Sequence, residues 1–382
     1  GLEQADPPTV GGQVVLAGEE LQVELEEIPR TRDELAKGLG AMGLDVAVRI
    51  VGSGDGDHAD GEPGGQEIVK HAGQAFWYSL LGVFLLAAPW LLSEYMLAQL
   101  VFVLIYATVG LGLMLLAGFT GLFSIGHAAF LGVGAYTEAV LAHHGWPFPL
   151  SLAMSALLAA AVGAVVGLPA LRVKGIYLGI ATLSFGFIVE EVLARWESLT
   201  GGNAGKHVPT LNAFGWEASD ETRFYMVCLV VTTLSTLAVL NLLRSPTGRA
   251  FVAIRDSEIS AQSMGIHLAY YKTISFMISA ALAGLGGALY AHYQLQVSPQ
   301  LFAVVTSVTI ITMVYVGGMA SIYGPIGGAL LLTLMTELLR NFGEWRLMVY
   351  SVVLILILFF LPQGLVAPTW QRIRRAFLGG KS

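Results

Sequence analysis

The pattern of hydrophobic and polar positions divides the chain near residue 75. Beyond that point, long apolar stretches follow one another with short polar breaks. A helix needs about 20 mostly apolar residues to cross a bilayer. The pattern therefore predicts ten spans: Phe76–Leu92, Tyr95–Ala117, Gly126–Ala142, Pro149–Leu168, Ile176–Trp196, Phe224–Leu243, Thr273–Tyr293, Val304–Ala320, Ile322–Leu339 and Leu347–Leu361. The last three are short, and residues 317–328 alternatively form a re-entrant or broken segment. Another open alternative is that one stretch is a buried helix that does not span.

Residues 1–75 show a weaker pattern. Residues 14–16, 21–25 and 45–51 resemble short strands, residues 31–42 favour one capped helix, and residues 52–65 form a linker rich in glycine and acids. We expect a small polar appendage of unknown role, either α/β-like or disordered. The chain begins without methionine or a signal-peptide pattern, which suggests a fragment or a fusion.

Composition supports a membrane protein. Of 382 residues, 55% are hydrophobic and 12% are charged, against roughly 25% charged in average soluble domains, and the mean hydropathy is +0.69. These values argue against a disordered protein, a nucleic-acid binder and an ordinary soluble enzyme. The single cysteine, Cys228, excludes an intrachain disulfide and a cysteine-based metal cluster. We therefore predict an all-α polytopic membrane protein without a catalytic or metal site.

Charge predicts the orientation. Residues 1–75 carry 15 acidic and 5 basic residues, and residues 76–382 carry the remaining 12 and 15. Loops on the cytoplasmic side of membrane proteins are enriched in lysine and arginine. With ten alternating spans, one side holds 11 basic residues and the other holds 5: the first set is Lys70, Arg172, Lys174, Arg244, Arg249, Arg255, Lys272, Arg372, Arg374, Arg375 and Lys381, and the second is Arg195, Lys206, Arg223, Arg340 and Arg346. Both termini are therefore predicted to be cytoplasmic, with residues 371–382 as a basic tail.

The long inner loop between Leu243 and Thr273 is the most informative segment. Residues 245–248 predict a turn, and Asp256 is a plausible N-cap for a short amphipathic helix that ends around Gly265. On that helix one face would carry Glu258, Ala261 and Gly265. Small residues on one face, with a carboxylate at the start, suit docking into a groove of another protein. The predicted coupling residues are Arg255, Asp256, Ser257, Glu258, Ala261 and Gly265; the alternative is a solvated loop.

Several sequence blocks resemble a known family. Ser260-Ala261 followed by Gly265 is similar to the Ala-Ala-x-x-x-Gly coupling motif of ABC importer permeases, although Ser260 replaces one alanine and Ile259 separates it from Glu258. The blocks are residues 121–137, 174–186, 199–205, 248–266, 280–290 and 361–365, and they resemble the LivM-type branched-chain amino acid permeases in family order. The resemblance covers about residues 76–370, and residues 1–75 match no part of the family.

The resemblance implies a permease subunit of an ATP-driven importer in the bacterial inner membrane. Leucine, isoleucine, valine or a similar small solute would cross by alternating access, delivered by an extracytoplasmic solute-binding protein. Two ATPase subunits would bind ATP and magnesium, and a second related permease would complete the channel. This chain would bind no cofactor and no nucleic acid, and its lipid-facing helices would contact the membrane. Residues 201–207 superficially resemble a phosphate loop, but Thr200 occupies the first glycine position.

A zwitterion needs polar groups and broken backbone along its path through hydrocarbon. In the third and fifth spans the candidate path residues are Ser124, Gly126, His127, Tyr136, Thr137, Tyr177, Thr182 and Ser184, with Phe185 beside the apolar part of the substrate. Each hydroxyl has an alternative role, a hydrogen bond to a carbonyl of its own helix.

Three other functions are weighed. A proton- or ion-coupled secondary transporter would need an ionisable residue near the midplane, whereas Glu138, Glu190, Glu191 and Glu337 fall toward span ends. An intramembrane hydrolase based on Ser124 and His127 lacks a third residue to orient the histidine. A purely structural scaffold gives no reason for the coupling-like loop.

Overall fold

The computed structural model describes residues 85–319, except 171–172, 174, 214–215 and 218–219, together with residues 321–339 and isolated positions between 345 and 359. Contacts divide the chain into residues 1–70 and residues 71–382, and every described residue belongs to the second part. The predictions for the N-terminal appendage, the basic tail and most of the first and tenth spans therefore fall outside the described residues.

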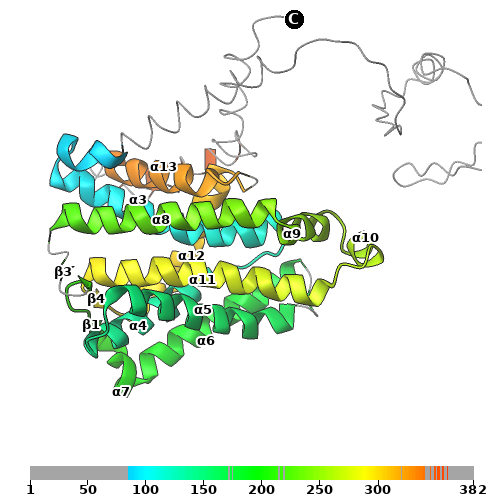
Figure 1. Ribbon diagram of the computed structural model, residues 1–382, viewed down its shortest axis with the longest axis horizontal. Helices are drawn as coiled ribbons and strands as arrows, with labels where there is room; N and C mark the ends of the chain where they lie inside the picture. The colour runs from blue at the N-terminus through cyan, green and yellow to red at the C-terminus, as the bar shows by residue number, and fades with distance from the viewer. Residues whose placement is uncertain are drawn as a thin grey trace, which may run out of the picture. The chain divides into compact units, whose positions relative to one another are not determined.

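The described part is mainly helical (Figure 1). Its helices are α3 (Glu94–Leu113), the π-helix η1 (Met114–Phe119), α4 (His127–His143), α5 (Phe148–Ala170), α6 (Ile176–Arg195), α7 (Glu197–Thr200), the 3-10 helix η2 (Gly202–Ala204), α8 (Glu221–Arg244), α9 (Pro246–Asp256), α10 (Glu258–Ser263), α11 (Leu268–Gln294), the 3-10 helix η3 (Pro299–Phe302), α12 (Val304–Gly317) and α13 (Gly324–Leu338). Residues 85–91 are also helical.

Six described segments are long and apolar enough to cross a membrane: Glu94–Phe119, Phe148–Pro169, Ile176–Arg195, Glu221–Arg244, Leu268–Gln294 and Pro299–Gly317. Each coincides with a predicted span, which confirms a multi-pass helical membrane protein. The predicted third and ninth spans correspond to the shorter helices α4 and α13, of 17 and 15 residues. The total of ten spans stays a prediction.

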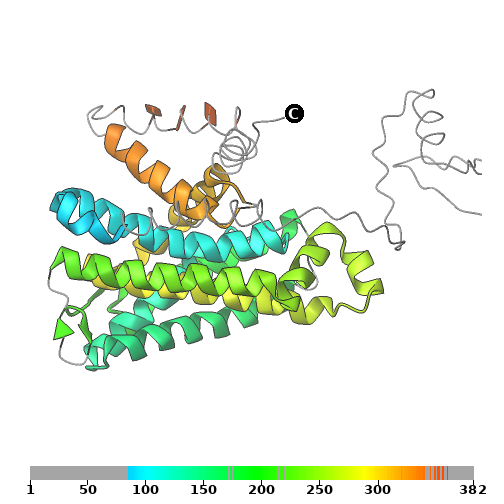
Figure 2. The same cartoon turned by 45° about the horizontal axis from the view of Figure 1, so that its top comes forward.

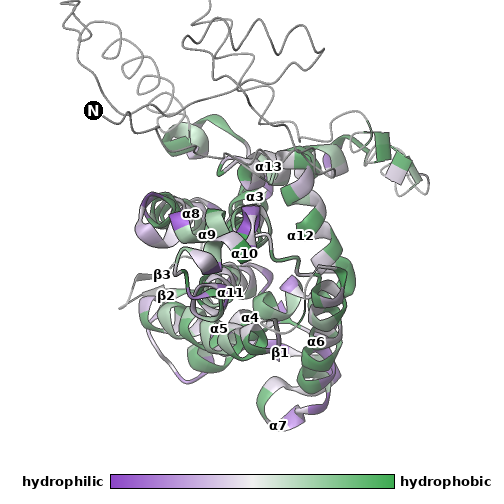
Figure 3. Cartoon of the chain, turned by 90° about the vertical axis from the view of Figure 1, so that its right-hand side faces the viewer, coloured by the Kyte–Doolittle hydropathy of each residue, from purple (hydrophilic) through white to green (hydrophobic). Residues whose placement is uncertain are grey.

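The long helices lie side by side, with α3 and α11 at the centre (Figures 1 and 2). In the most apolar window of α3 with η1, 78% of residues are buried, and in α11 72%, against 28% in each of α5, α6 and α8. The outer helices therefore present apolar residues outward, as the hydropathy colouring in Figure 3 shows. Helices in membranes associate through close packing of small residues, and Gly284 of α11 lies against both Gly134 of α4 and Ser155 of α5.

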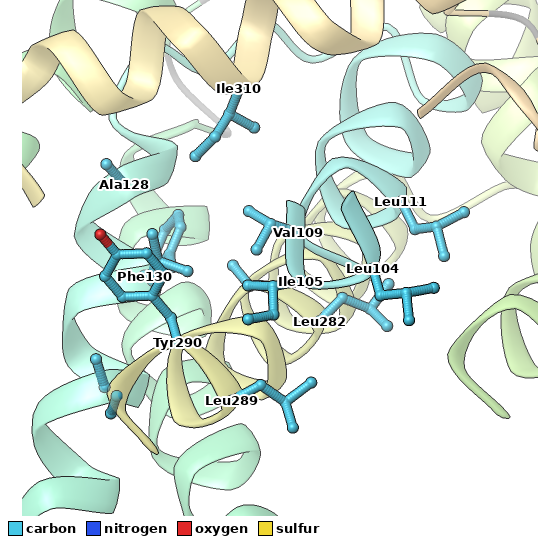
Figure 4. Packing of buried hydrophobic residues seen from close by; sticks show 14 of the residues in the cluster. Leu104, Ile105, Val109, Leu111, Ala128, Phe130, Leu282, Leu289, Tyr290 and Ile310 are labelled. Atoms are coloured by element: carbon cyan, nitrogen blue, oxygen red, sulfur yellow. The ribbon is translucent and has the colours of Figure 1, made fainter. Parts of the chain in front are cut away.

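The central core joins α3, α4, α11 and α12 (Figure 4). Ile105 and Val109 of α3 face Phe130 of α4, while Tyr290 of α11 and Ile310 of α12 complete the same cluster. All five side chains are at most 6% exposed. Because α3, α4 and α12 share this core, the non-helical chain between η1 and α4 is held inside the bundle.

The described residues include two small antiparallel sheets. Strand β1 (Lys206–His207) pairs with β4 (Gln296–Val297), with Lys206 opposite Val297, and β2 (Asn212–Ala213) pairs with β3 (Trp216–Glu217). Figure 1 shows these sheets at one end of the bundle and α9 and α10 at the opposite end. The bundle therefore has two distinct ends, one carrying short strands and the other carrying the predicted coupling segment.

The α12–α13 connection is a tight break in the region where the sequence allows a broken segment. Helix α12 ends at Gly317 and α13 begins at Gly324. A Cβ atom added at Gly317 would overlap the Gly324 carbonyl, and one added at Gly328 would overlap the Met313 carbonyl. Glycine at these positions allows the two helix backbones to touch.

Candidate coupling and translocation site

The predicted coupling segment forms two short helices, α9 and α10. Ser257, the residue after the predicted N-cap Asp256, caps α10: its hydroxyl accepts a hydrogen bond from the Ser260 N–H at 3.2 Å. Asp256 instead ends α9. Residues 245–248, predicted as a turn, begin α9, where Ser245 is the N-cap and Pro246 occupies the first turn. That Ser-Pro pair was the sequence signal for the missed helix.

Two of the predicted docking residues face the protein's own membrane helices. Ala261 is 1% exposed. Glu258 pairs with Lys272 of α11 at 2.6 Å, and the Lys272 side chain is 3% exposed. The large hydrophobic residues exposed here are Ile259 of α10 and its C-cap residue Met264, at 78% and 77% exposure. The periodicity of a sequence shows which residues share a face of a helix. It does not show which of the faces packs against the rest of the protein.

Arg255 links this segment to the membrane interior. Its Nη1 donates to the carbonyl of Gly118 at 3.1 Å, and its Nη2 lies 2.9 Å from Asp256 Oδ1. Gly118 belongs to η1, and the neighbouring Gly121 has φ +73° and packs against Arg255. Arg255 therefore contacts the last turn of η1 before the chain leaves the helix.

Gly265, another predicted coupling residue, is exposed, has φ +82° and has open space around its α-carbon.

The chain between η1 and α4 brings several predicted path residues together. The Ile125 N–H donates to Thr182 Oγ1 at 2.9 Å, and the Ala128 N–H donates to Ser307 Oγ at 2.9 Å. Gly126 lies directly against the Thr182 backbone. Side chains from α6 and α12 thus bind backbone donors where the α4 helix starts.

Ser124 and His127 lie in this same segment. Ser124 is 1% exposed and His127 is fully buried. The Ser124 hydroxyl and both ring nitrogens of His127 have no hydrogen-bond partner among the described residues. The His127 ring packs edge-on against Phe130, with centroids 5.8 Å apart, and Phe130 contacts Phe185 at 5.4 Å.

The other predicted path residues lie elsewhere. Tyr136 donates to the Val297 carbonyl at 3.4 Å, near β4. Thr137 and Ser184 bond to the carbonyls of Val133 and Ile180 in their own helices. Tyr177 is 73% exposed on α6, and Ser184 is exposed on the same helix. Gly126, His127 and Thr182 are therefore together, whereas these four are apart from them.

Glu138 is the buried acid that the sequence analysis missed. It lies toward the end of α4, as expected, but it is fully buried rather than solvated. Its Oε1 lies 2.8 Å from Nε2 of His292 in α11, and its carboxylate accepts from Ser151 and Ser155 of α5 at 2.6 and 3.3 Å. By contrast, Glu191 is exposed and pairs with Arg195 one turn later.

The geometry of the Glu138–His292 pair places a proton between the two residues. The Pro209 carbonyl oxygen lies 3.1 Å from His292 Nδ1 and can only accept, so Nδ1 carries hydrogen. The contact between Nε2 and Glu138 Oε1 then also needs one proton. Imidazolium with carboxylate, or imidazole with carboxylic acid, both satisfy it, and the pair is neutral overall in either form.

A groove of about 960 Å³ lies beside the end of α6 near η2 and η3. Its polar lining comes from Glu190, Glu191, Arg195, Asn203 and Gln300. No group of three or more metal-ligating side chains occurs among the described residues. The described part thus combines the predicted coupling segment (α9 and α10) at one end, a non-helical stretch between η1 and α4, and the buried Glu138–His292 pair.

Together these features describe a helical, multi-pass membrane protein. A family model described as "Branched-chain amino acid transport system / permease component" matches residues 95–361. The chain belongs to this family, and the match lies within the permease domain predicted at 76–370.

Curated relatives agree with that membership. The high-affinity branched-chain amino acid permease protein LivM of Salmonella typhimurium is 34% identical over 326 residues, covering 79% of this chain and 77% of the relative. The LivM protein of Escherichia coli gives the same identity and coverage. The LivH permease protein of Escherichia coli is 24% identical over 280 residues, covering 68% of this chain and 91% of the relative. No solved structure matches the chain.

Proposed function

We propose that this chain is the permease subunit of an ATP-driven importer that moves leucine, isoleucine, valine or a similar small solute across the bacterial inner membrane. Family membership and similarity to LivM support the substrate class. Similarity to LivH as well supports pairing with a second, related permease. Two ATPase subunits would hold ATP and magnesium, and a solute-binding protein would deliver the substrate from the opposite side, with both termini of this chain cytoplasmic.

The observation that carries the proposal is the orientation of α10. The Glu258–Lys272 pair and the buried Ala261 attach one face of this short helix to the bundle, while Ile259 and Met264 are exposed on the outside. An ATPase groove would cover the two apolar side chains. Asp256, Ser257 and Gly265 shape the segment: the first ends α9, the second caps α10, and the third reverses the chain in a left-handed conformation.

Two contacts would transmit a movement of α10 to the membrane helices. One is the buried Glu258–Lys272 pair, which joins α10 to the central helix α11. The other is Arg255, which holds the Gly118 carbonyl at the end of η1. The second route leads directly to the non-helical chain beside Gly126 and Thr182, where backbone polar groups can line a path. Tyr136, Thr137, Tyr177 and Ser184 remain proposed path residues for other stages of transport.

The Glu138–His292 pair is the observation that favours a second function, proton-coupled transport. A buried ionisable residue in a membrane helix is a functional candidate by default. In this structure the pair has protein partners on every side: Ser151, Ser155 and the Pro209 carbonyl. That arrangement fits a structural tie between α4, α5 and α11 better than a proton route.

Energy coupling separates the two functions. The complete transporter, with both permeases, both ATPases and the solute-binding protein, is reconstituted in vesicles. We expect leucine uptake to require ATP and to persist when an uncoupler removes the proton gradient. Uptake that continues without ATP but stops with the uncoupler would establish the carrier instead.

Docking through Ile259 is tested by Ile259→Asp. A charge at this 78% exposed position would have to be desolvated in the ATPase groove, so we expect the ATPase subunits to co-purify at least tenfold less well and uptake to fall in parallel. Ile259→Val keeps an apolar side chain and is the matched control, expected near wild type. Full ATPase retention by Ile259→Asp would contradict the docking surface.

Arg255 is tested by Arg255→Gln, which removes the guanidinium that holds the Gly118 carbonyl. Because Arg255 acts toward the membrane interior, we expect ATPase subunits to remain bound while uptake per ATP hydrolysed falls about tenfold. Arg249→Gln, an exposed position on the same helix whose side chain bonds only to the Arg244 carbonyl among the described residues, is the control. Equal uptake per ATP in both variants would remove Arg255 from the coupling route.

A further inference from the structure

Three buried polar atoms cluster where the chain enters α4, and the described fold gives them no partner. They are the Ser124 hydroxyl and the two ring nitrogens of His127. The backbone carbonyl of Val109 lies near the His127 imidazole, but the contact does not meet the geometry of a hydrogen bond. An unmade hydrogen bond in a buried site costs about 1–3 kcal/mol per group. This cluster is therefore costly unless something else binds there.

The backbone around the cluster adds a preference for negative charge. Helix α4 is 17 residues long and begins at His127; its N-cap residue Gly126 has no side chain to cap it, and Ser307 of α12 accepts from the Ala128 N–H in the first turn instead. The start of a helix carries a partial positive charge that stabilises anionic groups. Thr182 and Ser307 accept from the Ile125 and Ala128 N–H groups, which fixes the orientation of this end of the helix.

The cluster also has an acceptor and an apolar wall. A neutral imidazole presents one N–H donor and one bare nitrogen, and a serine hydroxyl can donate. Phe130 lies edge-on to the His127 ring, and Phe185 packs against Phe130. The Ser124 hydroxyl can therefore donate to an anion, the bare nitrogen of His127 can accept from a cation, and Phe130 and Phe185 provide an aromatic surface beside the start of α4.

We propose that Ser124 and His127 bind the zwitterionic head group of the transported amino acid. The Ser124 hydroxyl and the start of α4 take the carboxylate, the bare imidazole nitrogen takes the ammonium group, and the aliphatic side chain lies toward Phe130 and Phe185. This assignment rests on the proposed function. It names the residues that meet the substrate inside the membrane.

In this conformation the cluster is closed, because Ser124 and His127 are at most 1% exposed. The same chain segment follows directly from Gly118 and Gly121, which Arg255 contacts. A movement of Arg255 would therefore act on the segment that carries Ser124. Substrate would enter only after this movement, so binding and coupling share one structural element.

Substitutions test the polar role of His127. In the complete reconstituted transporter, we expect His127→Phe and Ser124→Ala to lower ATP-driven leucine uptake at least tenfold while the variants still co-purify with both ATPase subunits in wild-type amounts. His127→Gln keeps a donor and an acceptor and should retain most uptake. Thr309→Val, which removes a hydroxyl that, among the described residues, bonds only within its own helix, to the Val305 carbonyl, is the matched control. Equal loss in the Phe and Gln variants, or no loss in either, would overturn the assignment.

Labelling tests contact with the substrate directly. Ser124→Cys is placed in the transporter with cysteine-free partners, and the wild-type chain, whose Cys228 is fully buried, gives the background. During ATP turnover, we expect leucine to slow modification by a small membrane-permeant thiol reagent at least fivefold. Modification at the same rate with and without leucine would show that the cluster holds water alone and would overturn the assignment. Failure of the proposed function is distinct, since the wild-type transporter would then show no ATP-driven leucine uptake.

Discussion

Replacing Glu138 with alanine is expected to lower the free energy of unfolding by about 3–5 kcal/mol, because three buried polar side chains lose their acceptor and each unmade buried hydrogen bond costs about 1–3 kcal/mol. Glu138 is fully buried and binds His292, Ser151 and Ser155, so the substitution leaves three polar side chains without this acceptor. Thermal or denaturant unfolding of the purified transporter in detergent measures the effect.

Two comparisons make the Glu138 result specific. Glu191→Gln removes an exposed carboxylate that pairs with Arg195, and exposed pairs contribute about 0–1 kcal/mol. If the buried pair acts as one unit, the cost of Glu138→Ala and His292→Ala together will be smaller than the sum of the two single costs. A Glu138 variant as stable as the Glu191 variant would contradict the buried pair.

Gly126→Ala is expected to destabilise the transporter by about 3 kcal/mol, at the upper end of the usual cost of overpacking. A Cβ atom at Gly126 would overlap the Thr182 carbonyl oxygen. Helix α6 would have to move away, breaking the hydrogen bond from the Ile125 N–H to Thr182 Oγ1. The amount of folded protein after detergent extraction and its unfolding midpoint both report this change.

Gly186→Ala is the matched control in the same helix contact. The nearest atom to an added Cβ at Gly186 is the Gly126 α-carbon at 3.5 Å, an ordinary van der Waals distance. Alanine also favours a helix over glycine by up to about 1 kcal/mol. We expect this variant to be as stable as wild type or slightly more stable. Equal destabilisation by both substitutions would contradict the tighter packing at Gly126 than at Gly186.

The apolar pattern predicted most of the fold because a bilayer imposes a single requirement on each span, enough apolar length. Tyr95–Ala117 and Pro149–Leu168, for example, match described helices within a few residues. The same rule cannot say which side of α10 the fold covers. Ala261 is buried and Ile259 exposed because the Glu258–Lys272 pair fixes that helix, and the pair forms only in three dimensions.

The Glu138–His292 pair escaped prediction for a similar reason. The two residues are separated by 154 positions in the chain, and near a span end a lone glutamate is normally solvated. Ser124, Gly126, His127 and Thr182 were predicted as path residues, and the structure brings them to one place. Among the described residues Ser124 and His127 have no hydrogen-bond partner, and this could not be read from sequence because it depends on every neighbouring helix.

The π-helix η1 allows the end of α3 to become longer without any added residues. A π-helix places more residues in each turn than an α-helix, so it is shorter for the same number of residues. Rewinding Met114–Phe119 into α-helical form would lengthen this end of α3 and push the following loop forward while the far end of α3 stays in place. Tension on Arg255, which binds the Gly118 carbonyl, could then be converted into a change of helical pitch, without sliding any helix past its neighbours.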